Sequence, residues 1–172
     1  RLDGVQTFLE GTFNESNTTG GYLFVVYSVN GDGGETSGRL FSMNSEFLQA
    51  YNSSKGFIWS LRKSNEGNLG YYHDNNWRGT HTLGFDSADG MLLHEIKVVA
   101  GSQISKINGG DTQTSNLSVG SLSSEEFQIG ANPAGNQTPA VDLEALYLFD
   151  HTLTDGNATK TRDYLNAKSS IY

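Results

Sequence analysis

The sequence predicts an all-β fold, a two-sheet antiparallel β-sandwich that carries one short C-terminal helix. Only 17% of the residues are charged, with 21 Gly and 2 Pro, a composition typical of many short strands joined by polar turns. Apolar and polar residues alternate in short segments, which Gly-, Asn- and Ser-rich stretches separate. The length of 172 residues suits a single domain over 1–172 with a sizeable core.

The first half of the chain predicts four strands, at 5–13, 22–29, 39–44 and 57–62. Residues 22–29 are apolar on both faces, as a central strand of a sandwich should be. The sequence Asn30-Gly-Asp-Gly-Gly predicts a turn that pairs this strand with 39–44. Trp59 has apolar neighbours and is expected in the core between the sheets.

The second half predicts five further strands, at 92–100, 104–108, 117–122, 127–131 and 141–149. The first two should form a hairpin, followed by a turn at Gly109-Gly110. Within 92–100, one face carries Glu95, Lys97 and Val99, which predicts a solvated face.

The strand at 141–149 begins polar and ends apolar. Asp142 and Glu144 precede Leu146 and Leu148 on one face, which predicts solvation at the start and cover on both faces near the end. Strict alternation would place five residues on the other face: Val141, Leu143, Ala145, Tyr147 and Phe149.

A helix should follow this strand. Thr154 is the expected N-cap, with Asp155 at the positive end of the helix dipole and Leu153 stapled onto Ala158. One stripe of the helix is modestly apolar and comprises Ala158, Thr161, Leu165 and Lys168. This stripe predicts a surface helix that covers the end of the strand. The opposite, solvated face should carry Lys160, Arg162 and Asp163, and the tail should return to the body of the domain.

This closing segment resembles a known family. The order Leu-Tyr-Leu-Phe-Asp, Thr-Leu-Thr-Asp, helix and Tyr-Leu-Asn-Ala-Lys is similar to the end of laminin-G-like domains of the concanavalin A-like lectin and glucanase superfamily. The segments 95–110 and 127–132 resemble strands that precede it there, so the likeness covers 91–172. It implies a jelly-roll sandwich, and its motifs are structural rather than catalytic.

Charge and composition exclude several partner classes. The net charge of −8 and scattered basic residues argue against nucleic acid. No apolar run is long enough for membrane insertion. Cysteine is absent, so the chain has neither a disulfide framework nor a thiolate site. A chain that starts at Arg1 is expected to be a piece of a larger protein.

The stretch at 68–85 carries the candidate binding residues. Sugars stack their apolar faces on Trp and Tyr and need planar amide, carboxylate or guanidinium partners for their hydroxyls. Both kinds of group occur together in the predicted carbohydrate-binding set, which is Tyr71, Tyr72, His73, Asp74, Asn76, Trp77 and Arg78. The alternative is structural: Tyr71 points inward from a strand, and a loop-borne Trp77 plugs the end of the sandwich.

No cofactor is required by any motif, and calcium is left open because many laminin-G-like domains bind one ion. Hard oxygen ligands could come from the candidates Asp32, Glu35, Asp86 and Asp89. The alternative for each is an acidic residue of a turn that holds no metal.

Catalysis has no motif to support it. Glucanases of the resembled superfamily carry Glu-X-Asp-X-Glu on one strand, and here only Asp142 and Glu144 come near that pattern. Related lyases use Gln-Ile-His, which Gln103-Ile104-Ser105 does not match. The sequence therefore predicts a protein without enzyme activity.

The functional expectation is a non-catalytic glycan-recognition module of a larger extracellular, cell-surface or virion-surface protein. One alternative is a structural or adhesion domain that contacts a protein receptor, as in a phage tail or bacterial surface protein. A glycoside hydrolase is the third possibility, and it would depend on Asp142 and Glu144.

Overall fold

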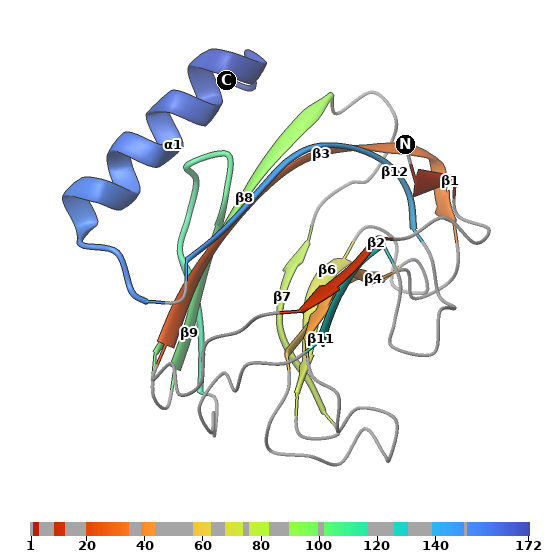
Figure 1. The fold of residues 1–172 in the computed structure, drawn as a ribbon, viewed down its shortest axis with the longest axis horizontal. Helices are drawn as coiled ribbons and strands as arrows, with labels where there is room; N and C mark the ends of the chain where they lie inside the picture. Colours follow the sequence, from red (N-terminus) through yellow and green to blue (C-terminus); the bar gives the residue numbers. More distant parts are fainter. Residues whose placement is uncertain are drawn as a thin grey trace.

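The fold is a β-sandwich with a helix on an outer face, as the computed structural model shows (Figure 1). Side chains are described for 21–28, 90–97, 99, 102, 104–112, 114, 129–130, 140–149 and 151–172. Elsewhere the structure describes only the backbone of the strands named below. The predicted all-β, two-sheet class with a C-terminal helix is confirmed.

Among the described residues, the first sheet has six strands, all paired antiparallel, in the order β1-β12-β3-β8-β9-β10. Their bounds are β1 (Leu2–Asp3), β12 (Pro139–Phe149), β3 (Gly20–Gly34), β8 (Met91–Val99), β9 (Ser102–Ile107) and β10 (Gln113–Asn116).

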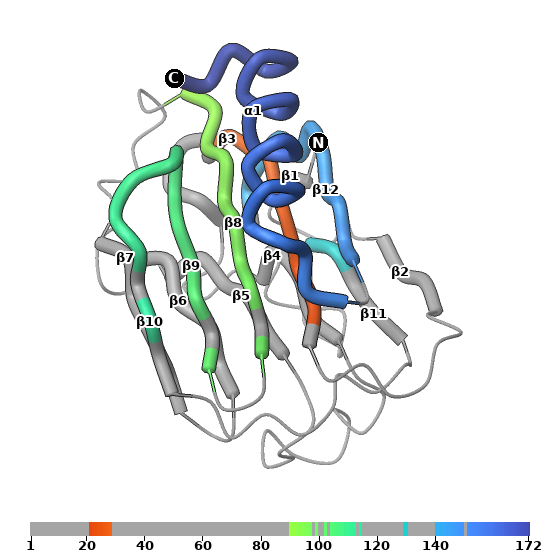
Figure 2. Tube along the Cα trace, turned by 90° about the vertical axis from the view of Figure 1, so that its left-hand side faces the viewer, coloured from red at the N-terminus to blue at the C-terminus, as the bar shows by residue number. Residues whose placement is uncertain are grey.

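In the part of the chain that the structure describes, the second sheet also has six antiparallel strands, in the order β2-β11-β4-β5-β6-β7. Their bounds are β2 (Leu9–Thr12), β11 (Glu126–Ile129), β4 (Arg39–Met43), β5 (Phe57–Arg62), β6 (Asn68–His73) and β7 (Asn76–Thr82). The two sheets form two layers, and β10 of the first lies beside β7 of the second (Figure 2).

The central strand β3 is buried on both faces, as its apolar sequence predicts. Toward the second sheet it presents Leu23, Val25 and Tyr27, which share that layer with Leu92 and Ile96 of β8. On the other face, a second cluster fills the space beneath helix α1 (Asp155–Ser169), and it comprises Tyr22, Phe24, Val26, Leu93, Leu153, Ala158 and Leu165. One sheet therefore separates two apolar layers.

The predicted pairing of 22–29 with 39–44 is wrong. β3 pairs with β12 and β8, whereas β4 lies in the other sheet between β11 and β5. A strand as long as β3 is matched by the 11 residues of β12 rather than by the 5 residues of β4. The chain therefore crosses between the two sheets where the sequence predicted a hairpin.

The Gly-rich turn predicted at 30–34 belongs to β3 instead. Its register against β12 is irregular, because Val29 lies opposite Val141 and Gly34 opposite Pro139. Glycine suits such an irregularity because it has no side chain to conflict with a bulged backbone. Strand β10 lies where the sequence predicted no strand, between those predicted at 104–108 and 117–122. The strand predicted at 117–122 lies outside the described residues.

A bulge in β12 corrects the predicted face pattern. Leu143 pairs with Tyr27 and Ala145 with Val26, so the register skips Glu144. One extra residue reverses the alternation. Val141, which is fully buried, and Leu143 therefore lie on the inner face, while Ala145, like Tyr147 and Phe149, packs against the cluster beneath the helix.

The helix begins as predicted. The Thr154 hydroxyl accepts a hydrogen bond from the Asn157 backbone N–H at 3.3 Å. Leu153 and Ala158 are both buried in the cluster beneath the helix. Leu165 is buried as well, but Lys168 is exposed and so does not extend the packed stripe.

The chain returns to the sheet after the helix, as predicted for the tail. Ser170 ends the helix in a left-handed conformation, and the Tyr172 backbone N–H donates to Asn166 Oδ1 at 2.9 Å. The Tyr172 hydroxyl lies so close to Gly109 that a Cβ there would meet it at 2.8 Å. Gly109, with φ +67°, follows Asn108 in the turn that leaves β9.

Candidate functional site

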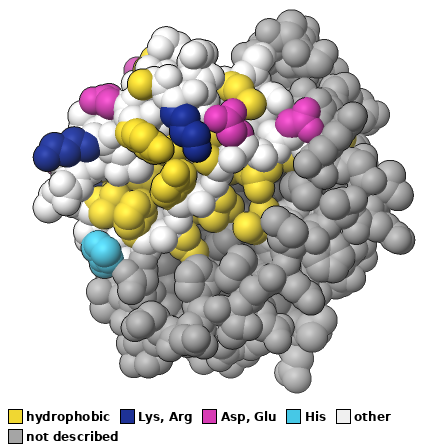
Figure 3. All heavy atoms as spheres, turned by 45° about the horizontal axis from the view of Figure 1, so that its top comes forward, with side chains coloured by type: hydrophobic (Ala, Val, Ile, Leu, Met, Phe, Trp, Pro, Cys, Tyr) yellow, Lys and Arg dark blue, Asp and Glu magenta, His cyan; other side chains and the backbone are white. Residues whose placement is uncertain are grey.

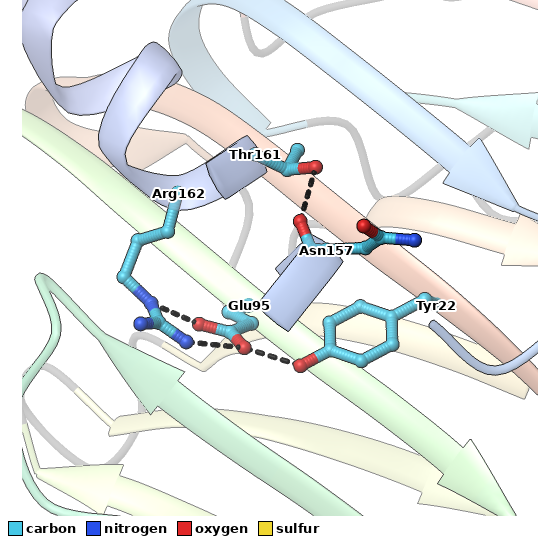
Figure 4. Close-up of polar contacts among 5 residues, drawn as sticks. All are labelled: Tyr22, Glu95, Asn157, Thr161 and Arg162. Atoms are coloured by element: carbon cyan, nitrogen blue, oxygen red, sulfur yellow. Dashed lines mark hydrogen bonds and ion pairs between the residues drawn. The ribbon is translucent and has the colours of Figure 1, made fainter. Parts of the chain in front are cut away.

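The outer face of the first sheet is occupied by α1, and a buried ion pair fastens the helix there. Arg162 of α1 donates to the Glu95 carboxylate through Nε at 2.6 Å and Nη2 at 2.9 Å. The Tyr22 hydroxyl donates to the same carboxylate from the neighbouring strand β3. Figure 4 shows the three side chains converging beneath the helix.

This arrangement overturns two sequence predictions. Glu95 was expected on a solvated face, yet it is 4% exposed. Arg162 was expected on the solvated side of the helix, yet its side chain is 17% exposed. The two residues are 67 positions apart in the chain. The pattern that predicts exposure for each of them involves only its own strand or helix. No residue spacing within the strand or the helix indicates that the polar face of the helix packs over the polar face of β8.

Burial and the ion pair shift two pKa values in this cluster. The pKa of Tyr22 lies well above its usual value, because burial and then the hydrogen bond to Glu95 disfavour the phenolate. The hydrogen bond to Glu95 likewise raises the pKa of Arg162. The three groups thus form one satisfied network around a single carboxylate.

Two weaker contacts hold the ends of the helix. Lys97 Nζ lies 3.7 Å from Asp155 Oδ1 near the N-terminus, where the Asp155 side chain is fully exposed. At the C-terminal end the Ser169 hydroxyl donates to Glu144. Glu144 thus supports the helix, and the bulge separates it in register from Asp142, which lies opposite Ser28.

The predicted carbohydrate-binding residues lie in a β-hairpin made of β6 and β7. Tyr72 lies opposite Trp77. Tyr71 lies opposite Arg78, and His73 opposite Asn76. Trp77 is therefore a strand residue rather than a loop residue. Asp74, between the strands, lies outside the described residues.

The register divides this set between the two faces of the second sheet. Successive strand residues belong to opposite faces, and residues paired across strands share a face. Tyr72 and Trp77 therefore share one face. The four others described, on the opposite face, are Tyr71, His73, Asn76 and Arg78.

The composition of the two faces indicates which one meets the core. The face of Tyr71 continues into apolar positions, namely Leu9, Phe41, Met43, Phe57, Trp59, Leu61, Leu69, Phe127 and Ile129. The face of Tyr72 and Trp77 continues into Glu10, Ser42, Ile58, Ser60, Arg62, Asn68 and Gln128. A sheet packed on one side buries its apolar face, so this pattern predicts that Tyr72 and Trp77 lie on the outer face.

Only one of the four calcium candidates lies in the part of the chain that the structure describes. Asp32 lies in β3. Glu35, Asp86 and Asp89 lie outside the described residues. Among residues that are described, no group of three or more His, Asp or Glu could hold a metal ion.

The face that carries the helix also presents apolar side chains, gathered among charged ones (Figure 3). Tyr164 and Tyr172 are more than half exposed. Phe149 contacts the ring of the exposed His151 edge-on, with ring centroids 6.2 Å apart. In the described part of the chain, no helix combines the length and apolar content that a membrane span needs.

Comparison with known proteins identifies the fold class. No family model and no curated protein matches the sequence. Solved structures that match include concanavalin A-like jelly rolls, which confirms the resemblance at the level of the fold.

Three of these structures show the extent of the likeness. The LG4-5 domains of the mouse laminin alpha1 chain match at TM-score 0.62 and 13% identity, over 89% of this chain and 42% of that one. A heptameric SAP-like pentraxin from Limulus polyphemus matches at 0.62 and 14%, over 94% and 79%. A GH54 α-L-arabinofuranosidase soaked with 4-nitrophenyl α-L-arabinofuranoside matches at 0.69 and 8%, over 98% and 40%. The chain thus spans less than half of the laminin and arabinofuranosidase chains.

Proposed function

We propose that this chain is a non-catalytic glycan-recognition module of a larger extracellular or surface protein. The observation that supports this is the pairing of Tyr72 with Trp77 on the polar face of the second sheet. Two large aromatic residues side by side on such a face offer a platform for the apolar face of a sugar ring. Ser60 and Asn68, on the same face, offer hydrogen-bonding groups for sugar hydroxyls.

The two outer faces of the sandwich differ in a way that favours this site. Helix α1 covers the outer face of the first sheet, where the Glu95 network fastens it. The aromatic pair lies on the second sheet, in the other layer. Of the predicted set, we therefore assign stacking to Tyr72 and Trp77. Tyr71, His73, Asn76 and Arg78 share the opposite face by register, and we assign them no contact with the sugar.

We assign the module no catalytic role, although one similar structure is a glycosidase. Hydrolysis needs two carboxylates placed about 5–10 Å apart on either side of the scissile bond. The bulge puts Asp142 and Glu144 out of regular alternation, and Glu144 accepts a hydrogen bond from Ser169. Both belong to the first sheet, away from the aromatic pair.

A glycan array followed by titration calorimetry tests the proposal. We expect Trp77→Ala and Tyr72→Ala each to weaken binding of the best array ligand at least tenfold, a loss of about 1.4 kcal/mol. Tyr164→Ala is the matched control, because it removes an exposed aromatic ring from the helix on the other layer. Unchanged affinity in both hairpin variants, with melting temperatures preserved, would contradict the proposed site.

A second function, contact with a protein partner, is favoured by the exposed Tyr164 and Tyr172 on the helix-bearing face. Aromatic residues are enriched in protein–protein interfaces. A protein-binding role predicts that Tyr164→Ala weakens attachment to receptor-bearing cells while Trp77→Ala does not. The reverse pattern supports the glycan role.

A further inference from the structure

Helix α1 brings few buried side chains to its contact with the first sheet. The structure describes all 15 residues of the helix, and the two that are buried are Ala158 and Leu165. Leu153, just before the helix, is buried with them. A helix of this length is marginal in water by itself, and packing of an apolar face normally supplies most of its stability. Polar contacts must therefore supply much of what holds α1 to the sheet.

Among these polar contacts, the ion pair near the middle of the helix is well shielded from water. The side chains of Arg162 and Glu95 are 17% and 6% exposed, and they share two hydrogen bonds. Charge-assisted hydrogen bonds of this kind are stronger than neutral ones, and a low local dielectric strengthens them further. The contact between Lys97 and Asp155 is screened by solvent, because Asp155 is fully exposed. The docking of α1 therefore depends strongly on Glu95.

The two apolar layers on either side of the first sheet use different residues of the same strands. β8 places Leu93 beneath the helix and Leu92 between the sheets. β3 likewise directs Phe24 toward the helix and Val25 toward the second sheet. Both strands are hydrogen-bonded to a neighbour on each side, β3 to β12 and β8, and β8 to β3 and β9. Removal of α1 would therefore uncover one apolar layer and leave the strands and the other layer in place.

The segment that carries α1 is joined to the sheet by exposed residues. His151 and Thr152 are both exposed, and they lie between β12 and the buried Leu153. After the helix, the Asn166 side chain bonds to the Tyr172 backbone through both its nitrogen and its oxygen, each at 2.9 Å. The tail is thus tied to the helix itself. Proteins open locally in contiguous cooperative units of this kind.

We propose that residues 153–172 form a strap that leaves the first sheet as one unit while the sandwich stays folded. Glu95 sets how often the strap opens, because it is the countercharge that holds the helix. Opening exposes a surface of aromatic rings. Tyr22 and Phe24 stack with ring centroids 5.0 Å apart, and Phe149 meets Phe24 edge-on at 6.3 Å. The strap therefore controls access to an aromatic surface in the layer opposite to the proposed glycan site.

Thiol labelling tests the strap, because the chain contains no cysteine and an introduced thiol is unique. Leu93→Cys places the thiol beneath the strap, and Leu92→Cys places it between the sheets on the same strand. Labelling is made slow relative to closing, and its opening constant is compared with each variant's own unfolding constant from urea denaturation. We expect the two constants to agree for Leu92→Cys and the labelling constant to be at least tenfold larger for Leu93→Cys. Agreement in both variants would overturn the proposal.

Two further substitutions in the Leu93→Cys background test the role of Glu95. Glu95→Gln should raise the opening constant at least tenfold, because it leaves Arg162 in a largely buried position without its countercharge. Lys97→Met is the matched control, since it removes an ion pair of the same helix whose acidic partner is fully exposed. It should raise the constant far less. Equal effects of the two substitutions would overturn the role of Glu95.

Hydrogen exchange of the unmodified chain removes any dependence on the introduced thiol. The backbone N–H groups of 159–169 should share one opening constant and one urea dependence, with a larger constant than those of 24–26 in β3. Unrelated constants along the helix would indicate fraying residue by residue, and a constant equal to that of β3 would indicate opening of the whole protein. Either result would overturn the strap. Because no ligand enters these experiments, the proposed glycan site would still stand.

Discussion

At the scale of single residues, the Tyr27 hydroxyl lies in the core without a hydrogen-bond partner among the described residues. A buried hydroxyl that makes no hydrogen bond lowers stability, because folding removes its hydrogen bonds to water without replacing them. We expect Tyr27→Phe to raise the free energy of unfolding by roughly 1 kcal/mol. Urea denaturation measures this. Tyr22→Phe is the control and should lower stability, because the Tyr22 hydroxyl donates to Glu95.

Tyr22 and Tyr27 also predict how stability depends on alkaline pH. Burial raises the pKa of both hydroxyls in the folded protein, whereas the unfolded value is about 10. The unfolded chain therefore releases these protons first. The protonated hydroxyls make their full contribution to the free energy of unfolding below pH 10. As the pH rises from 10 toward the pKa values of the folded protein, this contribution falls by up to about 1.4 kcal/mol per pH unit for each group.

Denaturation curves between pH 8 and pH 11 check this dependence. Stability should fall above pH 10, and less steeply in Tyr27→Phe, which lacks one of the two groups. Identical slopes in the two proteins would show that Tyr27 does not contribute.

The Glu95 carboxylate predicts a contrast between a buried and an exposed ion pair. Glu95→Gln leaves Arg162 in a largely buried position without its countercharge, which should cost about 3 kcal/mol. Lys97→Met removes an ion pair whose acidic partner is fully exposed and therefore screened by solvent, and it should cost far less than Glu95→Gln. Thermal and urea unfolding of both variants give the comparison. Equal losses would mean that the Glu95 network does not fasten the helix.

At the scale of elements, the contact between the tail and the β9–β10 turn can be isolated with two glycines. Gly109 and Gly90 have φ values of +67° and +68°, so Ala at either site carries the same left-handed strain of about 1–2 kcal/mol. Only at Gly109 would the new Cβ meet Tyr172, at 2.8 Å. We expect Gly109→Ala to destabilise the protein more than Gly90→Ala does.

The comparison becomes decisive in a Tyr172→Ala background, where the two glycine substitutions should cost the same. A difference that persists without the Tyr172 ring would locate its cause elsewhere in the turn.

Elements with strong local signals could be predicted from the sequence, and relations between elements could not. The start of α1 follows from Thr154 and Leu153, which act on neighbouring residues. The pairing of β3 with β12 joins segments more than a hundred residues apart, and no turn sequence marks it. The sequence does not indicate the bulge at Glu144 either, because an extra residue can be recognised only from the register with a partner strand.

The candidate site shows the same limit. The aromatic and amide residues of 71–78 could be recognised by type, since the chemistry of sugar binding requires such side chains. Their division between two faces depends on the hairpin register, which joins Tyr72 to Trp77. The burial of Arg162 depended on docking α1 over β8, a contact between distant segments that helix periodicity does not specify.

At the scale of the whole molecule, stability and recognition should reside in opposite layers of the sandwich. Helix α1 packs on the outer face of the first sheet (Figure 1), and we propose that the aromatic pair lies on the outer face of the second. Thr154→Ala removes the N-cap and should cost about 1 kcal/mol of stability. Because the cap lies in the other layer, glycan affinity should not change.

Trp77→Ala should show the reverse behaviour. A residue on an outer sheet face adds little to the core, so the melting temperature should hardly change while glycan affinity falls at least tenfold. Melting curves and calorimetric titrations of both variants, made at a temperature where each is folded, separate the two roles. If Thr154→Ala also weakened binding, the two layers would be energetically coupled, because the helix would then act on a site that it does not touch.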